Sequence, residues 1–298
     1  MKFLINLCVS FLLFASPLGA SGTHDREFWR SIRAHDFAIP PGESIDRLAL
    51  EIADLAAQPD PELRDECGYE ILAAWVYQKN LVPGETLEAL RRKLIPGMTF
   101  HIGESDSPTI FRRSFSALYL SILAAQDLRK PFLSPTAFAD TLDTALKCYF
   151  DERDLRGYTP NGWAHATAHV ADLLKFLARN PQLSVADQRK LVHGIIQRCQ
   201  TFPSVLAWGE DLRMAAALLS IIQRNDLEPA TFDAWFKDLI AENKELGKTS
   251  PLNTTAYIRV RNQANILTQL AARIASKKPA EVPAEFISAL NATVADLN

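Results

Sequence analysis

The sequence predicts an all-α protein made of stacked antiparallel helical hairpins, about twelve helices in all, as in a HEAT-like α-solenoid or α/α toroid. Apolar residues recur at three- and four-residue spacing from about Thr23 onward, without the period-two alternation of a half-buried strand. Proline-containing turns punctuate the chain. Every second helix has a polar start and then turns rich in small residues. These starts recur roughly every 45 to 55 residues, the length of one HEAT-like unit.

The first segment is expected to be removed from the mature protein. Residues 1–20 begin with Met1-Lys2, continue as an apolar run to Ala15 and end in small residues, which is the pattern of a secretory signal peptide. The apolar run is too short to span a bilayer comfortably. We therefore expect a signal peptide over 1–20 and a single all-α domain over 21–298, exported to the periplasm or secreted, with no membrane insertion after cleavage.

The outer helices are predicted from ordinary amphipathic patterns, of which those over 43–58 and 231–247 are examples. Turns containing proline separate the helices along the chain. In order, these are Gln58-Pro59-Asp60-Pro61, Val82-Pro83-Gly84, Ile95-Pro96-Gly97, Leu133-Ser134-Pro135, Tyr158-Thr159-Pro160-Asn161-Gly162, Asn180-Pro181, Phe202-Pro203, Glu228-Pro229, Ser250-Pro251 and Lys278-Pro279.

The alternate helices, with their small residues, are predicted to form an inner layer, because small side chains let helices pack closely. These segments begin at Leu63, Phe111, Gly162, Glu210 and Tyr257. An open α-solenoid and a closed α/α toroid share this pattern, so the periodicity leaves both open. In either case the polar starts gather along one rim or concave face.

Charge and cysteine content narrow the classes of partner. The formal net charge is −3, and loss of Lys2 with the leader makes it −4. Nucleic acid and anionic membranes recruit proteins through clustered positive charge, so we expect a small molecule, a peptide or a protein instead. Cys67, Cys148 and Cys199 remain after the leader. They match no zinc or CxxC spacing and allow at most one disulfide.

Polar residues of chemical interest concentrate between Asp151 and Asp172. If a helix runs from Gly162 to Asn180, then His165, His169 and Asp172 fall at i, i+4 and i+7 on one face. Two imidazoles one turn apart could hold a divalent metal, the one cofactor that the pattern suggests, with Asp172 as a ligand or as the group that orients one ring. Packing of both histidines and metal-free acid/base work are the alternatives, since no HExxH motif is present.

Other polar residues near the inner-helix starts are candidates for contacting a substrate. Asp154 is a further candidate catalytic group, and Arg156 and Trp163 are candidates for substrate binding, although an Asp-Arg pair that braces a loop and a Trp in the core are the simpler interpretations. Arg113 and Asp65 could face the same concave surface. Salt bridges between repeats explain these last two equally well.

The order of several motifs resembles an uncharacterised bacterial family called domain of unknown function 2785. The motifs are Arg113-Ser114-Phe115-Ser116, Asp154-Leu155-Arg156-Gly157 and Gly162-Trp163-Ala164-His165-Ala166, followed by Ala168-His169 and Ala171-Asp172-Leu173-Leu174. Members of this family are regarded as helical proteins of unassigned activity. The resemblance implies a helical fold and a family-defining cluster around His165 and His169, but it carries no catalytic role.

Two classes of function fit these observations. The first is a hydrolase or lyase acting on a small polar molecule, such as a sugar or peptidoglycan fragment, with His165 and His169 as bases or metal ligands. The second is a non-catalytic binding or scaffold module that uses the concave face of an α-solenoid, a role that repeat architectures favour.

Overall fold

The protein is all-helical apart from one short hairpin. The computed structural model describes residues 24–276 and 281–297, so the predicted leader 1–20 lies outside the described residues. Within these ranges the chain forms twelve α-helices, two π-helical segments and one two-stranded sheet, which confirms the predicted all-α class. None of the helices described has the length and apolar character needed to cross a membrane.

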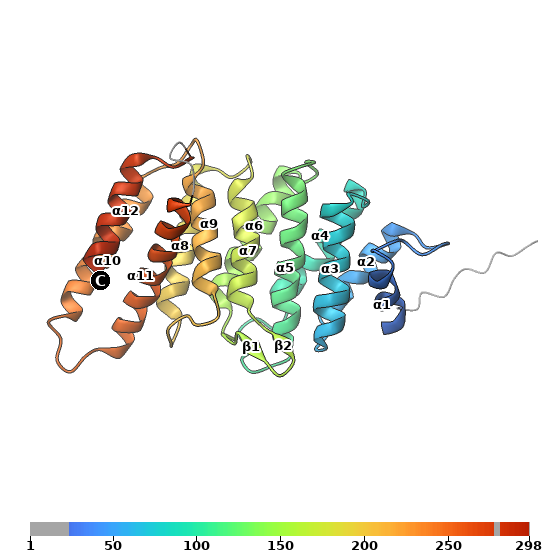
Figure 1. The fold of residues 1–298 in the computed structure, drawn as a ribbon, viewed down its shortest axis with the longest axis horizontal. Helices are drawn as coiled ribbons and strands as arrows, with labels where there is room; N and C mark the ends of the chain where they lie inside the picture. The colour runs from blue at the N-terminus through green and yellow to red at the C-terminus, as the bar shows by residue number, and fades with distance from the viewer. Residues whose placement is uncertain (1–23, 277–280, 298) are drawn as a thin grey trace, which may run out of the picture.

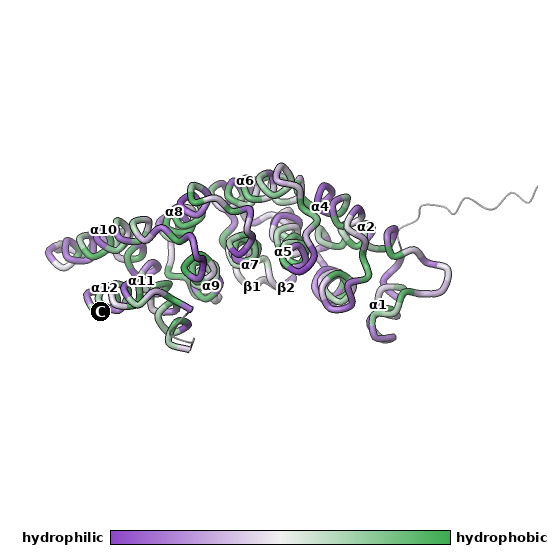
Figure 2. Tube along the Cα trace, turned by 90° about the horizontal axis from the view of Figure 1, so that it is seen from above, coloured by the Kyte–Doolittle hydropathy of each residue, from purple (hydrophilic) through white to green (hydrophobic). Residues whose placement is uncertain are grey.

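The helices lie in two curved layers, seen edge-on in Figure 2. The inner layer is on the concave side, and each of its members from α5 to α11 packs against the next. The outer layer comprises α2 (Ile45–Leu55), α4 (Gly84–Met98), α6 (Pro135–Asp151), α8 (Val185–Thr201) and α10 (Ala230–Leu246). The inner layer comprises η1 (Glu62–Tyr69), α3 (Glu70–Ala73), η2 (Ala74–Gln78), α5 (Thr109–Asp127), α7 (Ala166–Arg179), α9 (Glu210–Ile222) and α11 (Thr254–Ala275).

The two ends of the array are formed by different helices. In Figure 1, α1 (Arg26–Ala34) lies at one end and α12 (Ala284–Leu297) at the other. Side chains from both layers form one continuous hydrophobic core. Small residues allow the close approach of inner helices that the sequence predicts: a Cβ atom at Gly68 would lie 1.8 Å from the hydroxyl oxygen of Tyr119, which donates to the Arg64 carbonyl at 2.8 Å.

Two local expectations are wrong. The break expected at Ile95-Pro96-Gly97 is absent, because α4 continues through Pro96 to Met98. Pro96 has no N–H to donate, so the last turn of this helix has one backbone hydrogen bond fewer, but the helix does not end there. The helix expected from Gly162 begins instead at Ala166, after a hairpin of β1 (Tyr158–Thr159) and β2 (Gly162–Trp163).

The three described cysteines are packing residues. Cys67, Cys148 and Cys199 are buried and free. Burial raises the pKa of the Cys67 thiol to about 11 and that of Cys148 to about 12, so both stay protonated at neutral pH. No disulfide forms among these three residues.

Candidate functional site

A hydrogen-bonded hairpin places the first histidine. Tyr158 pairs with Trp163 and Thr159 with Gly162 in an antiparallel register. The ladder continues beyond the strands, since the Ala164 amide donates to the Gly157 carbonyl at 2.8 Å and the His165 amide donates to the Arg156 carbonyl at 3.0 Å. His165 then takes a left-handed conformation, φ 46°, and caps α7. The turn to Ala166 is therefore sharp.

A buried arginine from the first inner helix holds the tip of this hairpin. Arg64 is fully buried and donates to the carbonyls of Asn161 at 2.9 Å and Gln58 at 3.0 Å. It also donates to the Asp65 carboxylate at 3.1 Å, and its guanidinium lies over the Phe115 ring. Asp65 is one-third exposed beside the hairpin turn, and burial raises the pKa of its carboxyl group.

The structure brings His165 and His169 together although they do not share an uninterrupted helix. Their ring centroids are 5.6 Å apart and each side chain is about nine-tenths buried. Burial, with a smaller contribution from the charge of Arg213, lowers the pKa of His165 to about 4. Burial also lowers the pKa of His169 well below its usual value. Both rings are therefore uncharged at neutral pH.

Ser114, rather than the predicted Asp172, orients the second histidine. The Ser114 hydroxyl lies 2.7 Å from His169 Nδ1. Asp172 instead forms ion pairs with Arg213 and with Lys175, the latter at 3.1 Å. Both oxygens of the Asp172 carboxylate are therefore engaged by cations, one by Lys175 of the same helix and the other by Arg213 of α9. The expectation that Asp172 orients a ring is thus corrected.

The described residues give the two histidines of the predicted metal site no complete ligand set. Among the residues that the structure describes, no group of three or more His, Cys, Asp or Glu side chains is arranged to hold a metal ion. A His165–His169 centre would need its remaining ligands from water or substrate.

The side chains of Asp154 and Arg113 are buried, and both form ion pairs within the chain. The Asp154 side chain is 1% exposed and pairs with Arg156, whose Nε lies 2.8 Å from the carboxylate. Arg113 is fully buried and forms a two-pronged ion pair with Glu152, at 2.5 and 2.9 Å. It also donates to loop carbonyls at Phe100, His101 and Glu104. Arg113, a candidate for substrate binding, is therefore engaged with Glu152, and Asp154, a candidate catalytic group, is engaged with Arg156.

Three partly exposed aromatic side chains gather beside the histidines, and we call them the aromatic platform: Tyr158, Trp163 and Trp208. Trp163 stacks on His165 with centroids 4.9 Å apart, and it meets Tyr158 and Trp208 edge-on at 5.0 and 6.3 Å. Their exposed fractions are 57%, 39% and 50%. Trp163 is thus not a core residue, and the hairpin carries it at the ends of α5 and α7 (Figure 1).

Trp208 and Arg213 were missed by sequence reasoning. Trp208 precedes Gly209, the residue before α9, and packs so closely on Gly157 that a Cβ there would lie 2.2 Å from the indole. The available signal for Trp208 was the Trp-Gly pair just before the inner-helix start at Glu210. Arg213 belongs to the same helix start, but its pairing with Asp172 depends on packing between repeats.

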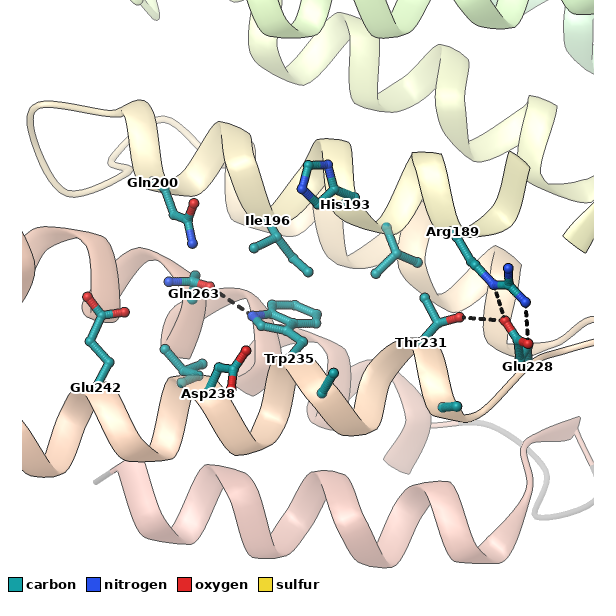
Figure 3. A pocket seen from close by; sticks show the side chains of 14 residues that line it. Arg189, His193, Ile196, Gln200, Glu228, Thr231, Trp235, Asp238, Glu242 and Gln263 are labelled. Carbon is teal, nitrogen blue, oxygen red and sulfur yellow. Dashed lines mark hydrogen bonds and ion pairs between the residues drawn. The ribbon is translucent and has the colours of Figure 1, made fainter. Parts of the chain in front are cut away.

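Two cavities lie in different layers of the array, and neither contains the histidine pair. A groove of about 420 Å³ between α7, α9 and the end of α11 includes Asp172 and Arg213 in its lining. A larger cavity of about 620 Å³ lies between the outer helices α8 and α10, with Trp235 at its floor and the Arg189–Glu228 ion pair at one end (Figure 3). This outer cavity contains neither histidine of the pair.

Comparison with known proteins agrees with the motif resemblance. No curated protein and no solved structure gives a significant match. The family described as "Protein of unknown function (DUF2785)" matches residues 98–272, a span that holds the hairpin, the histidine pair and the groove residues of α7 and α9. The chain therefore belongs to the domain of unknown function 2785 family.

Proposed function

We propose that the protein is a non-catalytic binding module whose aromatic platform takes up a small polar molecule with a ring, such as a sugar. The observation that carries this proposal is the meeting of Tyr158, Trp163 and Trp208, partly exposed side chains from two separate segments. The electron-rich face of an aromatic ring attracts the C–H face of a sugar. Partly exposed aromatic clusters on a surface commonly mark binding sites.

The polar groups beside the platform suit binding better than charge-driven catalysis. His165 lies under Trp163 and its Nε2 atom is buried without a hydrogen-bond partner. An imidazole nitrogen without a partner can form one hydrogen bond with a ligand hydroxyl. The carboxylates of Asp154 and Asp172 are already engaged by arginines.

A hydrolase or lyase is the second candidate. In its favour, His165 and His169 stay in the basic form at neutral pH, as a general base requires. Against it, a pKa near 4 makes His165 a weak base. Ser114 is no exposed nucleophile, since it is fully buried on α5.

We further propose an open HEAT-like α-solenoid that is exported after cleavage of residues 1–20. The separation of α1 and α12 in Figure 1 supports the open form over a closed toroid. The composition of residues 1–20 supports export. Amino-terminal sequencing of the protein from the extracytoplasmic fraction should give a start near Ser21, whereas an intact Met1 would contradict cleavage.

Titration of the mature chain with the β-1,4 trimer of N-acetylglucosamine tests the binding proposal, with tryptophan fluorescence as the readout. We expect a saturable change, and about two- to tenfold weaker binding for each of Trp163→Ala and Trp208→Ala. Tyr257→Ala is the control, because Tyr257 is 42% exposed on α11, outside the platform. An unsaturable response, or equal affinities in all variants, would overturn the proposal. Turnover of the trimer that is lost in His165→Ala would favour the enzyme.

A further inference from the structure

The concave groove between α7, α9 and the end of α11 has an unusual charge for this protein, and we call it the basic groove. Its described lining contains four cationic side chains and one carboxylate, an excess of three positive charges, in a chain whose formal net charge is −3. The charged lining residues are Asp172, Lys175, Arg179, Arg213 and Arg273. A cleft lined by one sign of charge concentrates ligands of the opposite sign.

The groove has few hydrogen-bond acceptors for its four cationic side chains. Lys175 and Arg213 share the single carboxylate of Asp172. Arg179 bonds a neutral group, the Ser220 hydroxyl, at 3.0 Å. Arg273 donates from Nη2 to the Leu212 carbonyl at 3.1 Å, while its Nε is buried with no hydrogen-bond partner. A buried donor without a partner is costly, so an added acceptor would be stabilising here.

The basic groove and the aromatic platform lie at different levels of the inner helices. Trp163 and Trp208 stand just before α7 and α9, whereas Arg179 ends α7 and donates to Ser220 near the end of α9. At a rise of about 1.5 Å per residue, the start and the end of α7 are roughly 20 Å apart. The groove is therefore a separate site from the platform.

We propose that the basic groove binds a small ligand through its oxyanion, a carboxylate or a phosphate. This site is independent of the aromatic platform proposed above. Arg179 and Arg273 are its main donors, because guanidinium groups form charge-assisted hydrogen bonds with carboxylate and phosphate. Lys175 and Arg213 add charge from the Asp172 side.

Two single variants test the donors. Calorimetric titration of the full mature chain with succinate at constant ionic strength should give saturable binding, and Arg179→Met and Arg273→Met should each weaken this binding roughly tenfold. Arg47→Met, an exposed residue of α2, is the control.

Thermal unfolding gives a second measurement. Succinate and inorganic phosphate should each raise the melting temperature saturably in the native chain but not in the Arg179→Met/Arg273→Met double variant, and the stronger of the two identifies the preferred oxyanion. Loss of this effect in the double variant supports the inference whether or not the platform binds a sugar. The absence of a saturable response in the native chain, or a response that survives in the double variant, would overturn it.

Discussion

At the scale of single residues, the uncharged histidine pair makes stability depend on pH. His165 and His169 have depressed pKa values in the folded protein, about 4 for His165, whereas unfolded histidine titrates near 6.5. Between these values the unfolded chain binds more protons. The free energy of unfolding should therefore fall as pH drops from about 6.5 toward 4, by up to about 1.4 kcal/mol per pH unit for each histidine.

Urea unfolding between pH 7 and pH 5 measures this dependence. His169→Gln should be less stable at pH 7 but should show a shallower loss on acidification, because one depressed pKa is gone. His35→Gln is the matched control, as His35 is exposed at the end of α1. Equal slopes for the two variants would show that burial of His169 does not oppose its protonation.

The residues that cluster at the site could be predicted from the sequence, but the contacts that they make could not. The sequence indicated His165, His169 and Asp172 as a cluster, and the structure does place the two rings together. The pairing of Asp172 with Arg213 joins residues 41 positions apart, and no local pattern reveals such a contact. The same reason hides Glu152, the partner of Arg113 from 39 positions away.

At the scale of elements, substitution of Gly162 tests whether Arg64 holds the tip of the hairpin. Its φ is +82°, and an added Cβ would lie 3.0 Å from both Arg64 Nη2 and the Pro61 Cβ. Gly42 has nearly the same φ, +85°, with no atom within 4 Å of the added Cβ. We expect Gly42→Ala to cost about 1–2 kcal/mol for the backbone alone, and Gly162→Ala to cost about 1–3 kcal/mol more for the contacts.

The two alanine variants are compared by the midpoints of their urea unfolding curves, which report stability when the m value is unchanged. If Gly162→Ala proves no more destabilising than Gly42→Ala, then Arg64 does not clamp the hairpin tip. Tryptophan fluorescence gives a second readout, because movement of the hairpin carries Trp163 with it.

Helices were predictable from periodicity, whereas the hairpin was not. Apolar spacing over many residues marks each inner helix, and small residues mark its layer. Two-residue strands give no periodic signal, so Tyr158-Thr159-Pro160-Asn161-Gly162 indicated a turn without its ladder. That ladder moves the start of α7 from Gly162 to Ala166 and sets the direction of His165.

At the scale of the whole molecule, buried arginines join neighbouring repeats. Arg113 links α5 to Glu152, and Arg198 of α8 donates to the Glu152 carbonyl at 2.7 Å. Removing one member of a buried pair leaves the other charge uncompensated, so Arg113→Met should destabilise the chain by about 3–5 kcal/mol. Adding Glu152→Leu should cost less than the sum of the two single changes.

Thermal and urea unfolding of the single and double variants give this coupling energy. The control is Arg189→Met, since Arg189 forms an exposed ion pair with Glu228, for which a loss of under about 1 kcal/mol is expected. Strict additivity of Arg113→Met and Glu152→Leu would mean that the two side chains do not interact in solution.

The open array that we propose also predicts the size of the molecule in solution. A compact domain of about 280 residues has a radius of gyration of roughly 19 Å. With α1 and α12 at opposite ends of the layers, residues 21–298 should exceed this value clearly in small-angle scattering. A closed toroid would bring its first and last repeats together and give a value close to that of a compact domain. The measurement thus decides between the two arrangements that helical periodicity leaves open, because closure changes the overall dimensions but not the local packing of one hairpin on the next.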